Sequence, residues 1–273
     1  MLREGKQSLA TGSKLGVPMS RTKRIQQVRT LIPFVFTFAN AFFGFLSITK
    51  SLEGEFVVAA WLILLAGVMD AFDGRLARYF GTAGELGGEL DSLCDAISFC
   101  VAPAILLYSW YLHDFGHAGV FSVVVGMYLC AGLFRLARFN LGTKEESLFF
   151  FGLPTTIAGA FLAFLIVYHN WFEHKPALHF VFNKASLVGI VASFAFLMIS
   201  SVRFPSFKKP NLSLRMPLTY VKLLIVIALM LWCWHHGYPF FLLLLTAYIG
   251  GSLLRVPFLK AYQRVARYKK KLR

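Results

Sequence analysis

The amino-acid sequence predicts an all-α fold, a polytopic membrane helix bundle with about eight transmembrane helices and both termini in the cytoplasm. Of the 273 residues, 57% are hydrophobic and only 15% are charged, and the mean hydropathy is +0.63. Soluble domains carry roughly 25% charged residues. The excess apolar surface therefore has to face lipid, where a helix satisfies its own backbone hydrogen bonds.

Eight apolar runs are long enough, or nearly long enough, to cross a bilayer. These runs are 31–49, 55–73, 90–112, 116–138, 152–172, 182–201, 217–235 and 237–257. We expect three segments: a basic cytoplasmic segment at 1–30, a transmembrane domain at 31–257 and a basic cytoplasmic tail at 258–273. Residues 20–29 mix basic and aliphatic side chains, which fits either an amphipathic interfacial helix or an unstructured tail.

The basic residues predict how the spans are oriented. The net charge is +15, and 25 of the 28 lysines and arginines fall on one side of the membrane if the N-terminus is cytoplasmic. Such residues collect in cytoplasmic loops, so both termini are predicted to be cytoplasmic. The charge then faces anionic lipid head groups, and we expect no nucleic-acid partner. Residues 1–30 lack the apolar stretch of a signal peptide, and with the compact length this favours a bacterial inner membrane.

Four of the chain's five aspartates lie close together in the sequence: Asp70, Asp73, Asp91 and Asp95. Asp70 and Asp73 are three residues apart at the end of the second span, so they share a helix face. Gly87, Asp91 and Asp95 are spaced by four residues, so they form a stripe along the third span. A glycine-rich turn between these spans would direct both faces at one point near the cytoplasmic membrane edge.

This clustering of carboxylates predicts a metal site. A charged side chain at the bilayer centre costs roughly 2.5–3.5 kcal/mol, and neighbouring carboxylates also repel one another. A divalent cation removes the repulsion, and hard oxygen ligands favour Mg²⁺, Mn²⁺ or Ca²⁺. Four carboxylates can hold two such ions bridged by phosphate oxygens. The alternative is a set of acids that cap helices or pair with nearby arginines, and it explains four converging aspartates poorly.

Small and basic residues beside the acids fit a phosphate-bearing ligand. Gly74 follows Asp73, and Ala77 lies about one turn further along, so a ligand can approach the helix backbone. Arg78 can bind a phosphate with its planar guanidinium group. The glycines at 81–88 also fit close helix packing through small residues.

The pattern formed by these residues resembles a known family signature. It reads Asp73-Gly74-x-x-Ala77-Arg78, eight residues, Gly87-x-x-x-Asp91-x-x-x-Asp95, with Asp70 as an additional leading aspartate. In residue type and spacing it resembles the full signature of the CDP-alcohol phosphotransferase family. Segments at 37–44, 90–104, 135–140, 151–155 and 203–208 are similar to the phosphatidylserine synthase branch of that family. The resemblance covers roughly residues 30–210, and Cys100 departs from it, because we expect glycine there.

The resemblance implies transfer of a phosphatidyl group from CDP-diacylglycerol to the hydroxyl of L-serine, giving phosphatidylserine and CMP. By analogy the four aspartates bind metal, Asp91 and Asp95 are catalytic, and Asp95 is the general base. A serine hydroxyl is a poor nucleophile and needs a nearby carboxylate to take its proton. Arg78 and metal would absorb charge on the diphosphate. Gly74, Ala77 and Gly87 would leave room for the nucleotide.

Residues outside the acidic stripe complete the expected site. Asn40 on the first span is a candidate contact to the nucleotide, and it equally fits a hydrogen bond to another helix. Arg135, Arg138 and Asn140 at the end of the fourth span are candidates for binding the acceptor carboxylate, although the arginines also fit ordinary membrane anchoring. By analogy with the family, we expect a homodimer.

Three alternatives remain open at this point. The same chemistry could use another acceptor, glycerol 3-phosphate or inositol phosphate. Membrane prenyltransferases also bind diphosphate through aspartates, but they carry two separated acidic motifs, and here only Asp114 follows Asp95. A cation transporter would spread acids over several spans, whereas the last four spans carry no Asp or Glu apart from Glu173.

Overall fold

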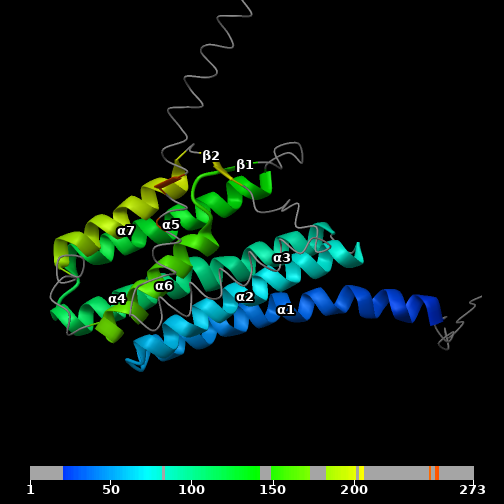
Figure 1. Cartoon of the computed structure of the whole chain (residues 1–273), viewed down its shortest axis with the longest axis horizontal. Coiled ribbons are helices and arrows are strands. Elements are labelled where there is room, and N and C mark those ends of the chain that lie inside the picture. The colour runs from blue at the N-terminus through cyan, green and yellow to red at the C-terminus, as the bar shows by residue number, and fades with distance from the viewer. Residues whose placement is uncertain are drawn as a thin grey trace, which may run out of the picture.

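The computed structural model describes residues 21–81, 84–141, 149–172, 183–200 and 203–205, together with residues 246, 250 and 251. Within this part, long helices lie side by side and form an elongated bundle (Figure 1). The predicted spans at 217–235 and 237–257, the predicted tail at 258–273 and residues 1–20 lie outside the described residues. The first six predicted spans can therefore be compared with the structure.

Each of these six spans corresponds to helical structure. The elements are α1 (Arg21–Leu52), α2 (Phe56–Phe80), α3 (Glu85–Asp95), the π-helical segment η1 (Ala96–Val101), α4 (Ala102–Phe115), α5 (Gly119–Leu141), β1 (Phe149–Phe151), α6 (Thr155–Phe172), α7 (Lys184–Ile199) and β2 (Arg203–Pro205). The third predicted span is built from α3, η1 and α4 in succession. Residues 21–30 are helical and continue directly into the first span, as part of α1.

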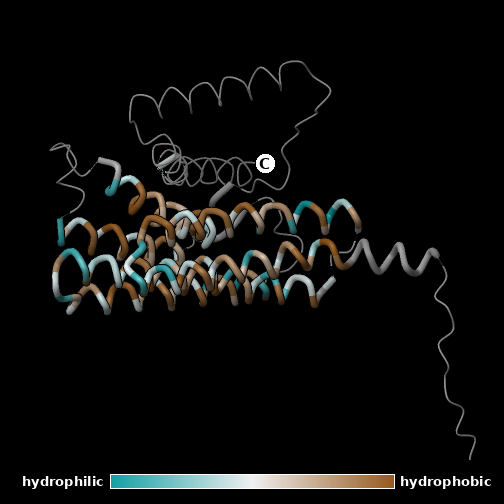
Figure 2. Tube along the Cα trace, turned by 90° about the horizontal axis from the view of Figure 1, so that it is seen from below, coloured by the Kyte–Doolittle hydropathy of each residue, from teal (hydrophilic) through white to brown (hydrophobic). Residues whose placement is uncertain are grey.

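Four helical stretches are long and apolar enough to cross a membrane. They are Leu31–Leu52, Phe56–Phe80, Leu86–Phe115 and Gly119–Leu141. Two shorter apolar helices, Thr155–Asn170 and Lys184–Ile199, accompany them. Hydrophobic residues run along the length of these helices (Figure 2). The prediction of a helical membrane bundle is confirmed at this level.

The residues on α1 have the arrangement expected of a lipid-facing helix. Its inner face buries polar side chains: Thr37, Asn40, Ser47 and Ser51. Its outer face exposes large apolar side chains by more than half of their surface: Leu31, Val35, Phe38, Phe42 and Phe45. A helix in water would bury the apolar face instead. Contact with lipid explains the inversion, because polar groups gain more from partners inside the bundle.

Small residues on α2 let the neighbouring helices approach closely. Ala59, Ala60, Ile63 and Ala66 have no exposed surface. This helix packs against α1 and α6, while α5 packs against α7. The Ser47 hydroxyl of α1 donates to the carbonyl of Ala59 at 2.8 Å, so a polar contact fixes the α1–α2 pair where their backbones meet.

The boundaries of two spans differ from the prediction at the acidic segment. The second span was predicted to end at residue 73 and the third to begin at residue 90, whereas α2 continues to Phe80 and α3 begins at Glu85. Gly81 ends α2 in the left-handed conformation, with φ 67°, which glycine adopts without steric cost. A span predicted from hydropathy ends where charged residues begin, whereas the α-helix itself continues through them. All four aspartates lie within these helices, as they did within the predicted spans.

The sequence prediction did not include the two short strands of the structure. β1 and β2 pair antiparallel, with Phe149 opposite Pro205 and Phe151 opposite Arg203. These strands follow α5 and α7, so the pairing joins the ends of two packed helices. Strands of three residues give no periodic signal in the sequence.

Candidate active site

Three carboxylates from two neighbouring helices meet inside the bundle. Asp70 projects from α2, and Asp91 and Asp95 project from α3. One carboxylate oxygen from each lies within 4.8 Å of the others, and all three side chains are half-buried. The acidic faces of α2 and α3 therefore point at the same small volume.

The fourth predicted ligand, Asp73, lies outside this group of three. It is buried, with 4% of its surface exposed, and its Oδ2 atom has no hydrogen-bond partner among the described residues. The side chain of Thr37 on α1 neighbours its carboxylate. Buried carboxylate oxygens are normally hydrogen-bonded or coordinate a cation. The Oδ2 atom of Asp73 is therefore available to coordinate a cation.

Two neutral side chains orient the acids from other helices. The Asn40 amide of α1 donates to Oδ1 of Asp95 at 3.0 Å. The Thr156 hydroxyl of α6 donates to Oδ2 of Asp70 at 3.4 Å. Asn40 was predicted either to contact the nucleotide or to bond another helix, and the structure shows the interhelical bond. Thr156 was missed, because the sequence gives no sign that α6 packs against α2.

The donor set of this cluster fits a divalent cation. All of its atoms are carboxylate oxygens, which suit Mg²⁺, Mn²⁺ and Ca²⁺. Among the described residues, Asp70, Asp73 and Asp95 form no ion pair with lysine or arginine. Clustered carboxylates repel one another, and a bound cation would relieve that repulsion.

The predicted nucleotide-binding residues line the same region. A Cβ atom at Gly74 would lie 3.5 Å from Nη1 of Arg78, so this guanidinium group extends over Gly74. A Cβ atom at Gly87, on the acidic stripe, would meet nothing within 4 Å. Gly87 and Ala77 are half-buried and Arg78 is exposed. Open space and an exposed guanidinium group therefore adjoin the carboxylates.

The three candidates for acceptor binding on α5 make different contacts. Arg135 is buried and donates to the Thr155 hydroxyl at 3.1 Å. Arg138 donates to the carbonyl of Ile199 at 3.1 Å, at the C-terminal end of α7. This contact caps the last turn of α7, where carbonyl groups lack helical partners.

Asn140 is the candidate that contacts the acidic helix directly. It accepts a hydrogen bond from the Ser92 hydroxyl at 2.9 Å and donates to Glu89 at 3.1 Å. Ser92 follows Asp91 on α3. Asn140 therefore joins the end of α5 to the helix that carries two of the clustered aspartates.

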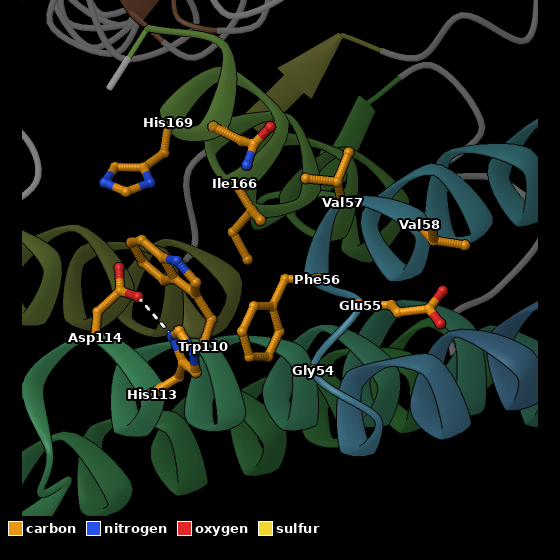
Figure 3. A pocket seen from close by; sticks show the side chains of 11 residues that line it. Gly54, Glu55, Phe56, Val57, Val58, Trp110, His113, Asp114, Ile166 and His169 are labelled. Atoms are coloured by element: carbon orange, nitrogen blue, oxygen red, sulfur yellow. Dashed lines mark hydrogen bonds and ion pairs between the residues drawn. The ribbon is translucent and has the colours of Figure 1, made fainter. Parts of the chain in front are cut away.

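A pocket lies at the end of the bundle opposite the aspartate cluster. It has a volume of about 400 Å³ and is lined by residues that include Phe56, Trp110 and His169. In Figure 3, His113 and Asp114 face each other at its rim, 3.1 Å apart. Asp70 is fourteen residues after Phe56 on α2, which is about 21 Å along a helix. This pocket is therefore separate from the aspartate cluster.

The fold and the cluster define a membrane-embedded helical protein with an acidic, metal-compatible centre. The chain belongs to the CDP-alcohol phosphatidyltransferase family, whose sequence pattern matches residues 30–252. It is accordingly a transferase, and this membership favours phosphatidyl transfer over the prenyltransferase and cation-transporter alternatives.

Several bacterial and archaeal relatives share much of the sequence. CDP-diacylglycerol--serine O-phosphatidyltransferase of Helicobacter pylori J99 is 32% identical over 189 residues, covering 68% of this chain and 76% of the relative. The Bacillus subtilis protein of the same name is 32% identical over 178 residues, covering 65% and 92%. Archaetidylserine synthase of Methanothermobacter thermautotrophicus is 35% identical over 177 residues, covering 64% and 69%.

Proposed function

We propose that this chain transfers the phosphatidyl group of CDP-diacylglycerol to the hydroxyl of L-serine and releases CMP. The names of its relatives support this donor and this acceptor. The observation that carries the proposal is the meeting of Asp70, Asp91 and Asp95 within 4.8 Å, since diphosphate chemistry needs a concentrated acidic site that can hold cations.

The four aspartates Asp70, Asp73, Asp91 and Asp95 would hold Mg²⁺ or Mn²⁺, with room for two ions. When bound, such ions neutralise charge on the diphosphate and position its oxygens. The buried Oδ2 atom of Asp73 and the three clustered carboxylates support this assignment.

Asp95 is the general base in this proposal. It would take the proton of the serine hydroxyl as the serine oxygen bonds to the phosphatidyl phosphorus, while the bond from that phosphorus to the CMP oxygen breaks. The Asn40 amide occupies one lone pair of Oδ1 of Asp95. That hydrogen bond fixes the carboxylate so that its remaining lone pairs point to the cluster.

The donor would bind against Gly74, Ala77, Arg78 and Gly87. The open space beside Gly87 and the guanidinium group over Gly74 support a nucleotide diphosphate at this surface. Arg78 would bind a phosphate oxygen, and the small residues would admit the nucleotide. The acceptor would be held from the α5 side by Arg135, Arg138 and Asn140, of which Asn140 contacts the acidic helix.

We also propose that the chain has eight spans, with both termini and the active site on the cytoplasmic side of a bacterial inner membrane. Segments 1–30 and 258–273 would be cytoplasmic, and two copies would form a homodimer. The distribution of lysine and arginine supports this orientation. In spheroplasts, a Gly84→Cys variant should resist a membrane-impermeant maleimide, whereas His117→Cys at the opposite end should react. The reverse pattern would invert the topology.

The function is tested with purified full-length protein, labelled CDP-diacylglycerol and Mn²⁺ or Mg²⁺. Serine, glycerol 3-phosphate and inositol phosphate compete as acceptors, and products are identified by mass spectrometry. We expect phosphatidylserine and an equal amount of CMP, and neither with Asp91→Asn. A preference for glycerol 3-phosphate would overturn the acceptor, and a lack of CMP release with every acceptor would overturn the function.

A further inference from the structure

The third span changes its helical winding directly after Asp95. Residues Ala96–Val101 form the π-helical segment η1, where the Ala102 N–H donates to the carbonyl of Ile97, five residues earlier. A π-helical segment inside an α-helix contains one more residue than the turns around it. This wider turn therefore sits between the acidic stripe and the apolar half of the same span.

Pro103 explains why the segment needs support from outside the helix. In an α-helix the carbonyl of Phe99 would accept from the N–H of residue 103, but proline has no N–H. The hydroxyl of Tyr128 on α5 donates to that carbonyl instead, at 2.8 Å. Tyr128 has no exposed surface, so its hydroxyl is committed to the carbonyl whose α-helical donor Pro103 cannot supply.

Three further contacts, from α1 and α5, surround η1. The Ser98 hydroxyl donates to the backbone carbonyl of Asn40 at 2.9 Å, and a Cβ atom at Gly44 would lie 2.9 Å from Cα of Ser98. On the α5 side, a Cβ atom at Gly132 would lie 2.6 Å from Sγ of Cys100. A larger residue at either glycine would therefore force Ser98 or Cys100 of η1 to move.

Asn40 connects these contacts around η1 to the carboxylate of Asp95. Its side chain donates to Asp95 and its backbone carbonyl accepts from Ser98. A movement of η1 would therefore displace Asp95 through the helix itself and Asn40 through Ser98. One residue corresponds to about 100° of rotation in an α-helix. If this turn were rewound as α-helix, one end of the span would rotate relative to the other. Either Asp95 would turn away from Asp70, or Leu107 and Trp110, which are buried, would become exposed.

We propose that Tyr128 is a positioning residue for the transfer reaction: its hydroxyl stabilises the π-helical turn at Phe99, and that turn aims Asp95 at the aspartate cluster. The proposal rests on the function proposed above. It assigns a role to a side chain that touches neither substrate nor any of the aspartates. In the same proposal, the close contact between Cys100 and Gly132 limits the movement of this turn toward α5.

The first experiment removes only the hydroxyl. Tyr128→Phe in the full-length protein should lower kcat by about tenfold or more, since small misplacements of a reacting group cost large factors in rate. The KM values for CDP-diacylglycerol and serine should stay within about twofold. The matched control is Tyr111→Phe, because Tyr111 is also buried and stacks on Phe121 at 3.9 Å, well beyond the end of η1 along α4; this variant should keep its kcat.

Binding of Mn²⁺ supplies a readout that is independent of turnover. Electron paramagnetic resonance of Mn²⁺ should show an altered spectrum for Tyr128→Phe, because Asp95 no longer aims at the cluster, and an unaltered one for Tyr111→Phe. A merely structural tyrosine would lower the thermal midpoint and leave the kcat and the spectrum of the folded fraction unchanged, which would overturn the proposal.

A second pair of variants tests the turn without touching Tyr128. Gly132→Ala should lower kcat, because its methyl group would push on Sγ of Cys100. Adding Cys100→Ala removes that sulfur and leaves the Cβ atom of residue 100 at 3.4 Å, so the double variant should regain most of the lost kcat. Failure of rescue in a folded double variant would overturn the proposal. An inactive wild-type protein would instead overturn the proposed function, so the two failures are distinguishable.

Discussion

Asn40 and Asp95 lie 55 residues apart in the chain and are joined by a hydrogen bond of 3.0 Å from the Asn40 amide to a carboxylate oxygen of Asp95. The bond links α1 to α3 across the interior of the bundle. Asn40 has no exposed surface, so its amide does not form this bond in competition with bulk water. The orientation of the proposed base therefore depends on a helix that carries none of the aspartates.

Asp95→Asn should abolish transfer while the protein stays folded. Asparagine has the same shape and can still accept from Asn40, but it cannot take a proton, and general-base catalysis is worth roughly 10²–10⁴ in rate. Release of CMP is the measurement, with the thermal midpoint and CDP binding as controls. Retention of most of the turnover would show that another group is the base.

Asn40→Ala should lower kcat by about tenfold or more and leave the fold intact. The loss follows from the freed orientation of Asp95. Ser47→Ala is the matched control, because Ser47 is buried two turns along the same face and bonds the carbonyl of Ala59. Equal losses of kcat in both variants would point to general damage of α1 packing.

Asp91→Ala should lose Mn²⁺ affinity together with activity. Removal of one of three converging carboxylates leaves a weaker oxygen site. Titration of Mn²⁺ by electron paramagnetic resonance measures the affinity, and Asp114→Ala at the opposite end of the bundle is the control. Undiminished Mn²⁺ binding by the Asp91 variant would exclude Asp91 as a ligand.

Gly87→Leu should block nucleotide binding, whereas Gly88→Leu should not. Neither position has an atom within 4 Å of an added Cβ, so both variants should fold. Only Gly87 lies on the acidic stripe, and a neighbouring residue is rotated by about 100° around the helix. The dissociation constant of CDP with Mn²⁺ is the measurement, and equal affinities in the two variants would remove Gly87 from the nucleotide site.

Gly152→Ala should prevent stable folding. Gly152 has φ 77°, where an L-residue loses roughly 1–2 kcal/mol. Its added methyl group would also collide with the carbonyl oxygen of Met198 and lie 2.9 Å from Nη2 of Arg138. Thermal unfolding of the purified protein measures the loss, and Gly126→Ala, with open space around it, should be neutral. A stable Gly152 variant would show that the contacts of residue 152 with Met198 and Arg138 can shift.

The amino-acid sequence was sufficient to predict the membrane class and the six described helical regions, and to single out the acidic residues of the candidate site. These features are local. A long apolar run indicates a membrane-spanning helix. The i, i+3 spacing of Asp70 and Asp73 and the i, i+4 spacing of Asp91 and Asp95 indicate that each pair shares a helix face. Such patterns need no knowledge of which helices touch.

Tertiary structure alone decided which groups surround those acids. The contacts of Asn40 with Asp95, of Thr156 with Asp70 and of Tyr128 with Phe99 join helices far apart in the chain. Pro103 and Cys100 could be read from the sequence, but the contacts that the π-helical turn Ala96–Val101 makes with Tyr128 and Gly132 come from another helix. The physical reason is that a missing helical hydrogen bond can be satisfied by any nearby donor, and only packing determines which donor is near.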